Sequence, residues 1–194
     1  MEEFGVRLFV AITLPEEMKQ AIGLLQGELR SLGGGVRWVK PEGIHCTLKF
    51  LGEVDPVRAE EIAEGLSAGT VARQFRLEVK HLGVFPGWSR PRVIWTGIET
   101  RGKELQQVHS YIEQALRTFG FPLDNRPFRP HLTLGRVRKQ EGLSALKEYC
   151  RERSKAINLG SFAAVSFSLY ESRLRPEGAE YRVLGTYPLA GDDE

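Results

Sequence analysis

The first third of the chain alternates between two patterns of apolar residues, one typical of strands and one typical of helices. Residues 7–12 (RLFVAI) form a short run of strand-forming side chains, and apolar residues then recur at helical spacing between positions 18 and 32. Three consecutive glycines end this helix. Residues 44–51 form another strand-like run, and residues 57–67 have the pattern of a second helix. This region therefore predicts a strand–helix–strand–helix unit.

The second half repeats this plan at a constant shift of 86 positions. Residues 93–98 and 131–137 are strand-like, and residues 102–119 between them have helical spacing. We interpret the match as a fused duplication, roughly 7–51 and 93–137, within one domain that spans residues 1–194. Two units related by a pseudo-twofold axis predict a two-lobed molecule with a central groove. The shift superimposes Gly34 on Gly120, Pro41 on Pro127, His45 on His131, Thr47 on Thr133 and Leu48 on Leu134.

The other segments are predicted to extend the two lobes. Residues 75–84 have the pattern of a strand and residues 143–152 that of a helix. Residues 162–170 and 181–189 are predicted to form a hairpin that turns at 175–178.

The composition is that of an ordinary globular protein, with 41% hydrophobic and 27% charged residues. A net charge of only +2 argues against a surface coated with nucleic acid but allows a local basic cleft. No apolar run approaches the length of a membrane span, and the acidic start Met1-Glu2-Glu3 is unlike a signal peptide. Cys46 and Cys150 lack metal-type spacing and are interpreted as buried free thiols. We therefore expect a cytoplasmic protein.

The chemistry is suggested by a short pattern that occurs twice, HCTL at 45–48 and HLTL at 131–134. In a strand, residues two positions apart share a face, so His45 and Thr47 point together, as do His131 and Thr133. A single His-x-Thr is usually a half-exposed histidine without a role. Duplication alone could also explain the recurrence, but most other positions of the two halves differ while His, Thr and Leu are kept.

Two facing histidines suit in-line displacement at phosphorus. One neutral imidazole removes a proton from the attacking oxygen, while the other, protonated, delivers a proton to the departing oxygen. A histidine pKa of about 6.5 allows both forms near neutral pH. Threonine hydroxyls can donate hydrogen bonds to the phosphate. The scheme requires no metal or other cofactor, and two histidines with two threonines would be a poor metal cage.

The chain resembles the 2H phosphoesterase superfamily, and specifically its RNA 2′,3′-cyclic phosphodiesterase branch, also called the LigT-like or 2′-5′ RNA ligase family. The resemblance rests on the paired motifs and on the segments RLFVAITLP, VRWVKPEGIHCTLKFLGEV, FRPHLTLGRV and SLYESRL. It implies a bilobal α+β fold, with a V-shaped cleft between two antiparallel sheets and helices on the outside. It also implies opening of terminal 2′,3′-cyclic phosphates to 2′-phosphomonoesters, and in some members 2′-5′ joining of RNA ends without ATP.

The resemblance assigns roles to matching residues. His45 would be the proton donor to the leaving 3′ oxygen and His131 the general base for water. Thr47 and Thr133 would contact the phosphate.

Arg136 matches an arginine expected to touch phosphate or base, and its repeat mate Phe50 matches an aromatic residue able to stack on a base. Each lies five residues after its histidine, an odd step that would point it away from the groove in an unbroken strand. Gly52 and Gly135 could mark kinks that redirect these side chains. Otherwise Phe50 would lie in the core and Arg136 on the surface.

Three functions remain open from the sequence. The first is hydrolysis of cyclic phosphates on RNA ends or nucleotides, and the second is ATP-independent ligation of RNA ends by the same histidines. The third is a non-catalytic RNA- or nucleotide-binding module. We expect a monomer. Of the other candidate residues, His81 and His109 are interpreted as surface or core residues, and Trp38 and Trp95 as core residues. Three arginines flank the second motif and are interpreted as solvated charges, which could supply positive potential for RNA phosphates: Arg126, Arg129 and Arg138.

Overall fold

A computed structural model describes residues 5–66, 72–175 and 178–191 of the chain. Helices and strands alternate along it, as the apolar pattern predicts. The strands are β1 (Val6–Thr13), β2 (Val36–Trp38), β3 (His45–Val54), β4 (Phe75–Phe85), β5 (Val93–Glu99), β6 (His131–Val137), β7 (Asn158–Ala164), β8 (Ser166–Arg175) and β9 (Gly178–Pro188). The helices are α1 (Glu16–Ser31), α2 (Pro56–Leu66), α3 (Glu104–Thr118) and α4 (Ser144–Arg153), with short 3₁₀ turns at Pro41–Gly43 and Ser154–Ala156.

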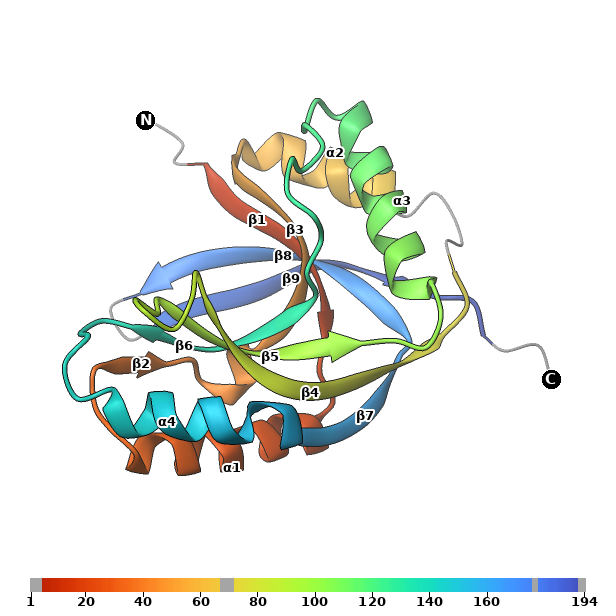
Figure 1. Cartoon of the computed structure of the whole chain (residues 1–194). Helices are drawn as coiled ribbons and strands as arrows, with labels where there is room; N and C mark the ends of the chain where they lie inside the picture. Colours follow the sequence, from red (N-terminus) through yellow and green to blue (C-terminus); the bar gives the residue numbers. More distant parts are fainter. Residues whose placement is uncertain (1–4, 67–71, 176–177, 192–194) are drawn as a thin grey trace.

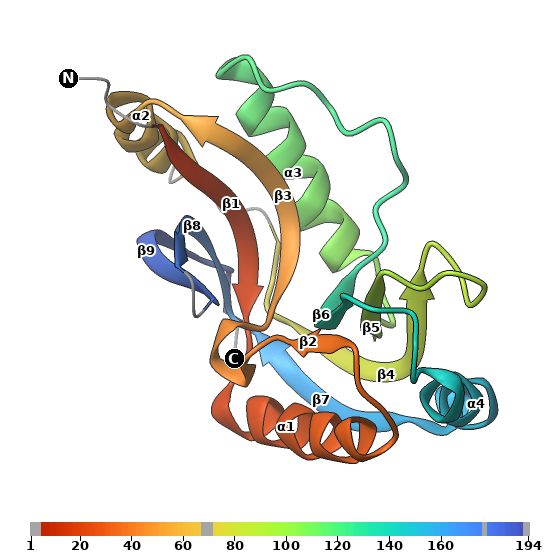
Figure 2. The ribbon, with the colours of Figure 1, turned by 90° about the vertical axis from the view of Figure 1, so that its left-hand side faces the viewer.

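The strands form two antiparallel halves of one strongly curved sheet, in the order β7-β4-β5-β6-β3-β1-β8-β9, with β2 beside β6 (Figure 2). The halves meet between β6 and β3, where a single pair of residues, Cys46 and Leu132, is in register. Beyond this pair β3 and β6 diverge, and β2 takes the place of β3 along the far end of β6. The predicted two-lobed α+β fold is therefore confirmed, with the lobes joined at their narrowest point.

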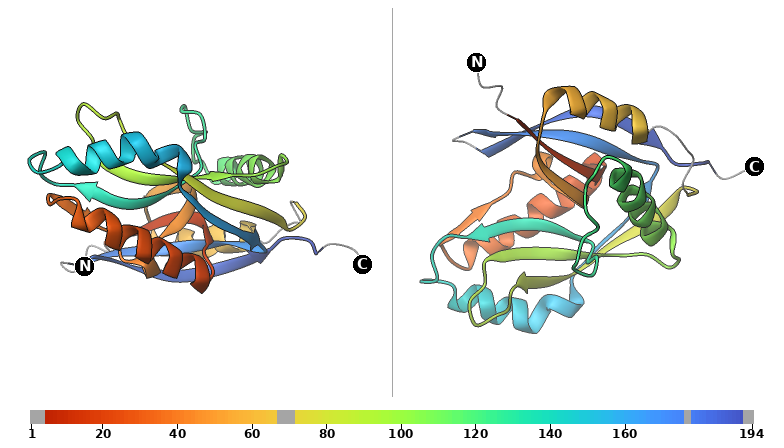
Figure 3. Two further views of the ribbon diagram at one scale, coloured as in Figure 1. Left: turned by 60° about the horizontal axis from the view of Figure 1, so that its bottom comes forward. Right: turned by 90° about the horizontal axis from the view of Figure 1, so that it is seen from above.

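The helices lie on the outer faces of the two halves (Figures 1 and 3). Two of them pack on the half of the sheet that does not contain the strand they follow in the sequence. Helix α1 follows β1 but packs with α4 beside β4 and β7, in the other half of the sheet. Helix α3 follows β5 but packs with α2 against β3, β1 and β9. The first helix of each predicted repeat unit thus packs on the other half of the sheet, α1 beside β7 and α3 beside β3.

The apolar stripes explain this packing. In α1, Met18, Ile22, Leu25 and Leu29 are all buried, as their spacing predicts. The same face carries a buried polar side chain, Gln26, which the apolar pattern did not single out.

Elements of the two halves correspond under the shift of 86 positions: β1 with β5, α1 with α3, β3 with β6, and α2 with α4. The residues that pair at the centre of the sheet, Cys46 and Leu132, are themselves equivalent under this shift. The local axis relating the halves therefore passes between them, which supports the predicted duplication.

One predicted element is wrong. Residues 162–170 are not one strand of a hairpin, because 162–164 belong to β7, beside β4, while 166–170 belong to β8, beside β1. The apolar alternation runs through Val165 without a turn residue. The sequence pattern therefore does not indicate where the chain passes from one half of the sheet to the other. The hairpin of β8 and β9 is confirmed, although its predicted turn includes residues 176–177, which lie outside the described residues. Ser67, the predicted last residue of the second helix, also lies outside them.

Among the helices of the described residues, none combines the length and apolar character that a membrane crossing requires.

Candidate active site

The two histidines begin strands β3 and β6, on either side of the pair that joins the halves. With Cys46 opposite Leu132 in antiparallel register, His45 comes next to Thr133 and Thr47 next to His131. These four residues are half-buried, while their neighbours Cys46 and Leu132 are fully buried on the opposite face. Diagonal neighbours of this kind lie about 7–8 Å apart at Cα, which leaves room for a phosphate between the imidazoles.

Both imidazoles are held in the same way. His45 Nδ1–H donates to the carbonyl of Gly43 at 2.9 Å, and His131 Nδ1–H donates to the carbonyl of Arg129 at 2.7 Å. Because a carbonyl can only accept, each bond fixes the proton on Nδ1 of the neutral ring. Gly43 and Arg129 are also equivalent under the 86-residue shift. Each histidine therefore presents Nε2 for proton transfer.

The odd step to Phe50 and Arg136 is resolved by a β-bulge in each motif strand. On β3, Thr47 pairs with Ala11 and Lys49 with Val10, so Leu48 is an extra residue. Because a bulge turns two successive residues to one face, Leu48 and Lys49 are both buried and Phe50 returns to the face of His45 and Thr47.

The second bulge lies at the equivalent place on β6. Thr133 pairs with Trp95 and Gly135 with Ile94, which leaves Leu134 as the extra residue and returns Arg136 to the face of Thr133. Phe50 and Arg136 are exposed on the side of the histidines. The predicted kink at Gly135 is confirmed, since Gly135 lies in this bulge. A kink is also present at Gly52, which has a positive φ of 78° and follows a further bulge of β3, where Leu8 pairs with Gly52 and Phe9 with Phe50. The bulge at Leu48, which precedes Phe50, is the one that redirects this side chain.

Aromatic rings surround His45. Phe9 stacks on the imidazole with centroids 4.5 Å apart, and Tyr181 meets it edge-on at 5.1 Å. Tyr170 stacks on the far side of Phe9 at 5.1 Å, and its hydroxyl is hydrogen-bonded to that of Thr13. Burial lowers the pKa of His45 to about 4, although the bond to Gly43 partly offsets this effect. With these neighbours alone, His45 is therefore neutral at neutral pH.

His131 lies beside two other rings, Phe85 at 5.2 Å and Trp95 at 6.2 Å, both edge-on. Trp95 is therefore not a core residue, as its apolar run suggested, but faces the cleft from β5. Its repeat mate is Phe9, so the shift that relates the histidines also relates the rings beside them.

Two further side chains were not identified from the sequence. Tyr181 lies near the charge of Arg136, which lowers the pKa of its hydroxyl, while burial, the larger effect, raises it. Arg37 of β2 pairs directly with Arg136 of β6, so two exposed arginines lie side by side on the groove face. Arg37 and Tyr181 lie outside the two motifs in the sequence, and nothing in the sequence pattern indicates that they lie near Arg136 and His45.

A buried charged cluster lies on the core side of β3. His109, Glu113 and Asp124 place ligand atoms within 4.8 Å of one another, a grouping that could attract a cation. The ammonium of Lys49 already lies there, 2.5 Å from Glu113 and 3.4 Å from Asp124. The Lys49 ammonium therefore already occupies the place of a cation, and His109, stacked on Phe128 at 4.0 Å, belongs to this cluster rather than to the motif residues.

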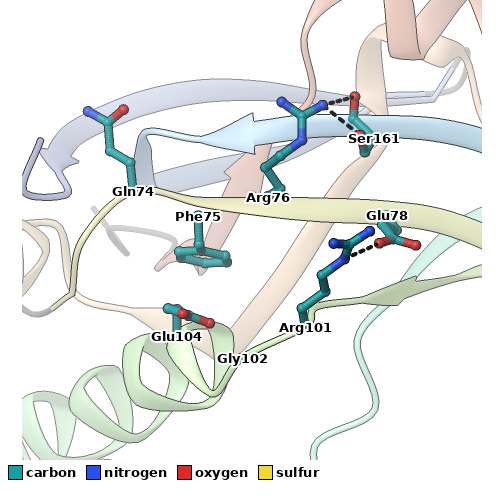
Figure 4. Close-up of a pocket in the computed structure, with 8 residues that line it drawn as sticks. All are labelled: Gln74, Phe75, Arg76, Glu78, Arg101, Gly102, Glu104 and Ser161. Carbon is teal, nitrogen blue, oxygen red and sulfur yellow. Dashed lines mark hydrogen bonds and ion pairs between the residues drawn. The ribbon is translucent and has the colours of Figure 1, made fainter. Parts of the chain in front are cut away.

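An open pocket of about 440 Å³ lies apart from the motif residues, between β4, β7 and the start of α3 (Figure 4). Its arginines already have partners: Arg76 donates to the hydroxyl and carbonyl of Ser161, and Arg101 pairs with Glu78. It contains neither histidine motif, so the cleft at β3 and β6 remains the candidate active site.

Comparison with known proteins agrees with this geometry. A sequence model described as "LigT like Phosphoesterase" matches residues 12–95 and again residues 98–181. An "RNA 2′,3′-cyclic phosphodiesterase" of Methanocaldococcus jannaschii is 35% identical over 179 residues, covering 92% of this chain and 98% of the relative. A solved structure from Thermus thermophilus has a TM-score of 0.77 at 27% identity, covering 96% of this chain and all of that chain. E. coli LigT complexed with 3′-AMP has a TM-score of 0.75 at 27% identity, covering 96% of this chain and 99% of that one. The chain belongs to the LigT-like phosphoesterase family.

Proposed function

We propose that this protein hydrolyses terminal 2′,3′-cyclic phosphates on RNA, with His45 and His131 as a metal-independent acid–base pair. The observation that carries the proposal is the paired arrangement of two imidazoles, each bonded through Nδ1 to a carbonyl and each leaving Nε2 for chemistry beside a threonine of the other motif. The RNA 2′,3′-cyclic phosphodiesterase of M. jannaschii and the 3′-AMP bound to E. coli LigT support a ribonucleotide substrate.

The reaction assigned to this site is an in-line displacement. His131 Nε2 takes a proton from water as the water oxygen bonds to phosphorus. The bond between phosphorus and the 3′ oxygen breaks, and His45 gives its Nε2 proton to that oxygen, which leaves a 2′-phosphomonoester. Thr47 and Thr133 donate hydrogen bonds to the non-bridging oxygens, where negative charge accumulates.

The acid role of His45 requires a protonated imidazole, which the burial of this side chain disfavours. Burial lowers the pKa of His45 to about 4, but the substrate brings a negatively charged phosphate next to the buried ring. An opposite charge in a poorly solvated place favours the imidazolium, so the pKa rises when substrate binds. The enclosing rings thus make the protonation of His45 depend on the phosphate.

The exposed side chains on the same face supply recognition. Arg136 and its neighbour Arg37 bind phosphate oxygens, which arginine forks suit well. Phe50, with 67% of its surface exposed, stacks on a base.

The test is to incubate the protein with an oligonucleotide ending in a 2′,3′-cyclic phosphate, in the presence of a chelator. We expect a 2′-phosphate product by phosphorus NMR, a bell-shaped pH profile, and loss of turnover in His45→Ala and His131→Ala. A 3′-phosphate product would reverse the assignment of the leaving oxygen. Dependence on added metal, or full activity in both variants, would overturn the mechanism. An oligonucleotide with a 5′-hydroxyl, added in a parallel reaction, tests for ligation.

We also propose that the protein works as a monomer in the cytoplasm. Cys46 and Cys150 are buried and form no disulfide. Burial raises the pKa of Cys46 to about 12 and that of Cys150 to about 11, so both stay as inert thiols, as a reducing compartment permits.

A further inference from the structure

The two bulges that turn Phe50 and Arg136 toward the cleft are each contacted from below by a buried polar side chain. These contacts come from α1 and α3, the helices that cross between the halves. The motifs themselves give no reason for polar groups at these places, since the surrounding positions are apolar and buried.

Under the β6 bulge lies Gln26 of α1, whose side chain is 1% exposed. Its Nε2 donates to the carbonyl of Leu134, the extra residue of the bulge, and to the carbonyl of Val39, both at 2.8 Å. The Leu134 carbonyl also accepts from the N–H of Val39 at 2.9 Å. The carbonyl of the extra bulge residue is therefore held by two donors, one from α1 and one from the residue that follows β2.

Under the β3 bulge, the second bulged residue is itself the polar group. The Lys49 side chain is 2% exposed and reaches Glu113 of α3 at 2.5 Å and the carbonyl of Pro122 at 2.9 Å. The second carboxylate oxygen of Glu113 accepts from the N–H of Asp124 at 3.0 Å. The bulge is thus fixed to α3 and to the segment that leads to His131.

Burying an ammonium and a carboxylate is costly, and an apolar pair of similar volume is often at least as stable. Such a pair can instead favour one defined strand register, in which Lys49 and Glu113 find their partners, as they do here. At both bulges, the residue whose direction depends on that register is the exposed one that follows, Arg136 or Phe50.

We propose that Gln26 and the Lys49–Glu113 pair are positioning residues that hold the two bulges and so aim Arg136 and Phe50 at the substrate. The proposal rests on the proposed function. Under this proposal, the direction of Arg136 depends on α1, from the first repeat unit, and the direction of Phe50 depends on α3, from the second.

The test is a set of double-mutant cycles on the cyclic-phosphate oligonucleotide. We expect Gln26→Met to lower kcat/KM roughly tenfold and to remove most of the further effect of Arg136→Ala, while Phe50→Ala keeps its full effect. The apolar replacement Lys49→Met/Glu113→Leu is expected to show the reverse, coupling to Phe50→Ala and not to Arg136→Ala. Leu29→Ala, a buried truncation on α1, is the control for lost stability and is expected to couple to neither.

Coupling of either helix variant to both cleft residues, or to neither, would overturn the proposal. So would losses of activity that only follow the loss of stability in Leu29→Ala. If the wild-type protein does not hydrolyse the substrate, the proposed function fails, and positioning is then read from crystal structures of the variants. A displaced Arg136 in Gln26→Met with Phe50 unmoved supports the positioning role without any activity, whereas an unchanged bulge contradicts it.

Discussion

The strands that carry His45 and His131 have the same backbone design and different surroundings. Each begins with a histidine bonded through Nδ1 to a carbonyl two residues earlier, and each has a bulge at the equivalent leucine, Leu48 or Leu134. Around this shared frame, His45 is enclosed by Phe9 and Tyr181 and has a lowered pKa. The comparison shows that the two strands share one backbone geometry, while the side chains packed around the two histidines differ.

The positions after the bulges differ in the same sense. The first strand presents an aromatic ring, Phe50, and the second a guanidinium, Arg136. The residue that follows the extra leucine also differs between the two bulges. It is Lys49, paired with a carboxylate, in one strand, and Gly135, where an added Cβ would lie 2.7 Å from Cγ1 of Val36, in the other. One half is therefore suited to a base and the other to phosphate, although both derive from one pattern.

The largest expected difference between the halves is in proton transfer. His45→Ala and His131→Ala should each lower kcat on the normal substrate by roughly 10²–10⁴-fold. With sulfur in place of the 3′ bridging oxygen, the leaving thiolate needs no proton, so His45→Ala should recover nearly full turnover and His131→Ala should not. Single-turnover rates for the two substrates measure this. Recovery in His131→Ala instead would exchange the two roles.

The next difference is in stability at the bulges. Lys49→Met leaves Glu113 buried without its partner, so the free energy of unfolding should fall by about 3–5 kcal/mol. Gly135→Ala forces β2 away from β6 and should cost about 1–3 kcal/mol. Urea unfolding measures both, with Lys49→Met/Glu113→Leu as the matched control that should regain most of the loss. A mild effect of Lys49→Met would show that water reaches the cluster.

A third difference is in the pH dependence of stability. The pKa of His45 is about 4 in the folded protein and about 6.5 in the unfolded chain, so the unfolded state binds more protons between these values. The wild-type protein should therefore lose up to about 3 kcal/mol relative to His45→Gln as the pH falls from 6.5 to 4. Unfolding curves at several pH values test this. Parallel curves for the two proteins would mean that His45 is better solvated than its surroundings indicate.

The smallest expected differences are in recognition. Phe50→Ala should raise KM by roughly tenfold, through loss of stacking, with little dependence on salt. Arg136→Ala should lower kcat/KM by a similar factor, and this loss should shrink as salt rises because a charge contact is screened. Titrations of salt against KM for both variants separate the two kinds of contact. Equal salt dependence would remove the distinction between the halves.

The sequence predicted the frame of the site better than its lining. The shared face of His45 and Thr47 follows from strand alternation alone, and the 86-residue shift pairs these residues with His131 and Thr133, which lie beside them across the Cys46–Leu132 pair. The bulge at Leu48 could not be read from the sequence, because it requires Lys49 to be buried. A lysine in a strand pattern reads as solvent-exposed, and the partners that make its burial tolerable, Glu113, Pro122 and Asp124, are distant in the sequence.

The same limit applies to residues that reach the site from other strands. Trp95 has the pattern of a core residue, and its place beside His131 depends on the pairing of β5 with β6. Arg37 meets Arg136 through the short strand β2, which has too few residues for a clear pattern. Such contacts are set by tertiary register, which a single sequence specifies only weakly.

The crossing of α1 and α3 bears on how such a molecule could have originated. In a chain with one unit, the apolar stripe of the helix would lack the strands of the other half of the sheet that α1 and α3 pack against here. Two copies that exchange these helices would bury both stripes, which is the arrangement of a domain-swapped dimer. Joining the copies end to end would then free each active-site strand to specialise, because one gene would encode two positions that had previously been constrained to be identical.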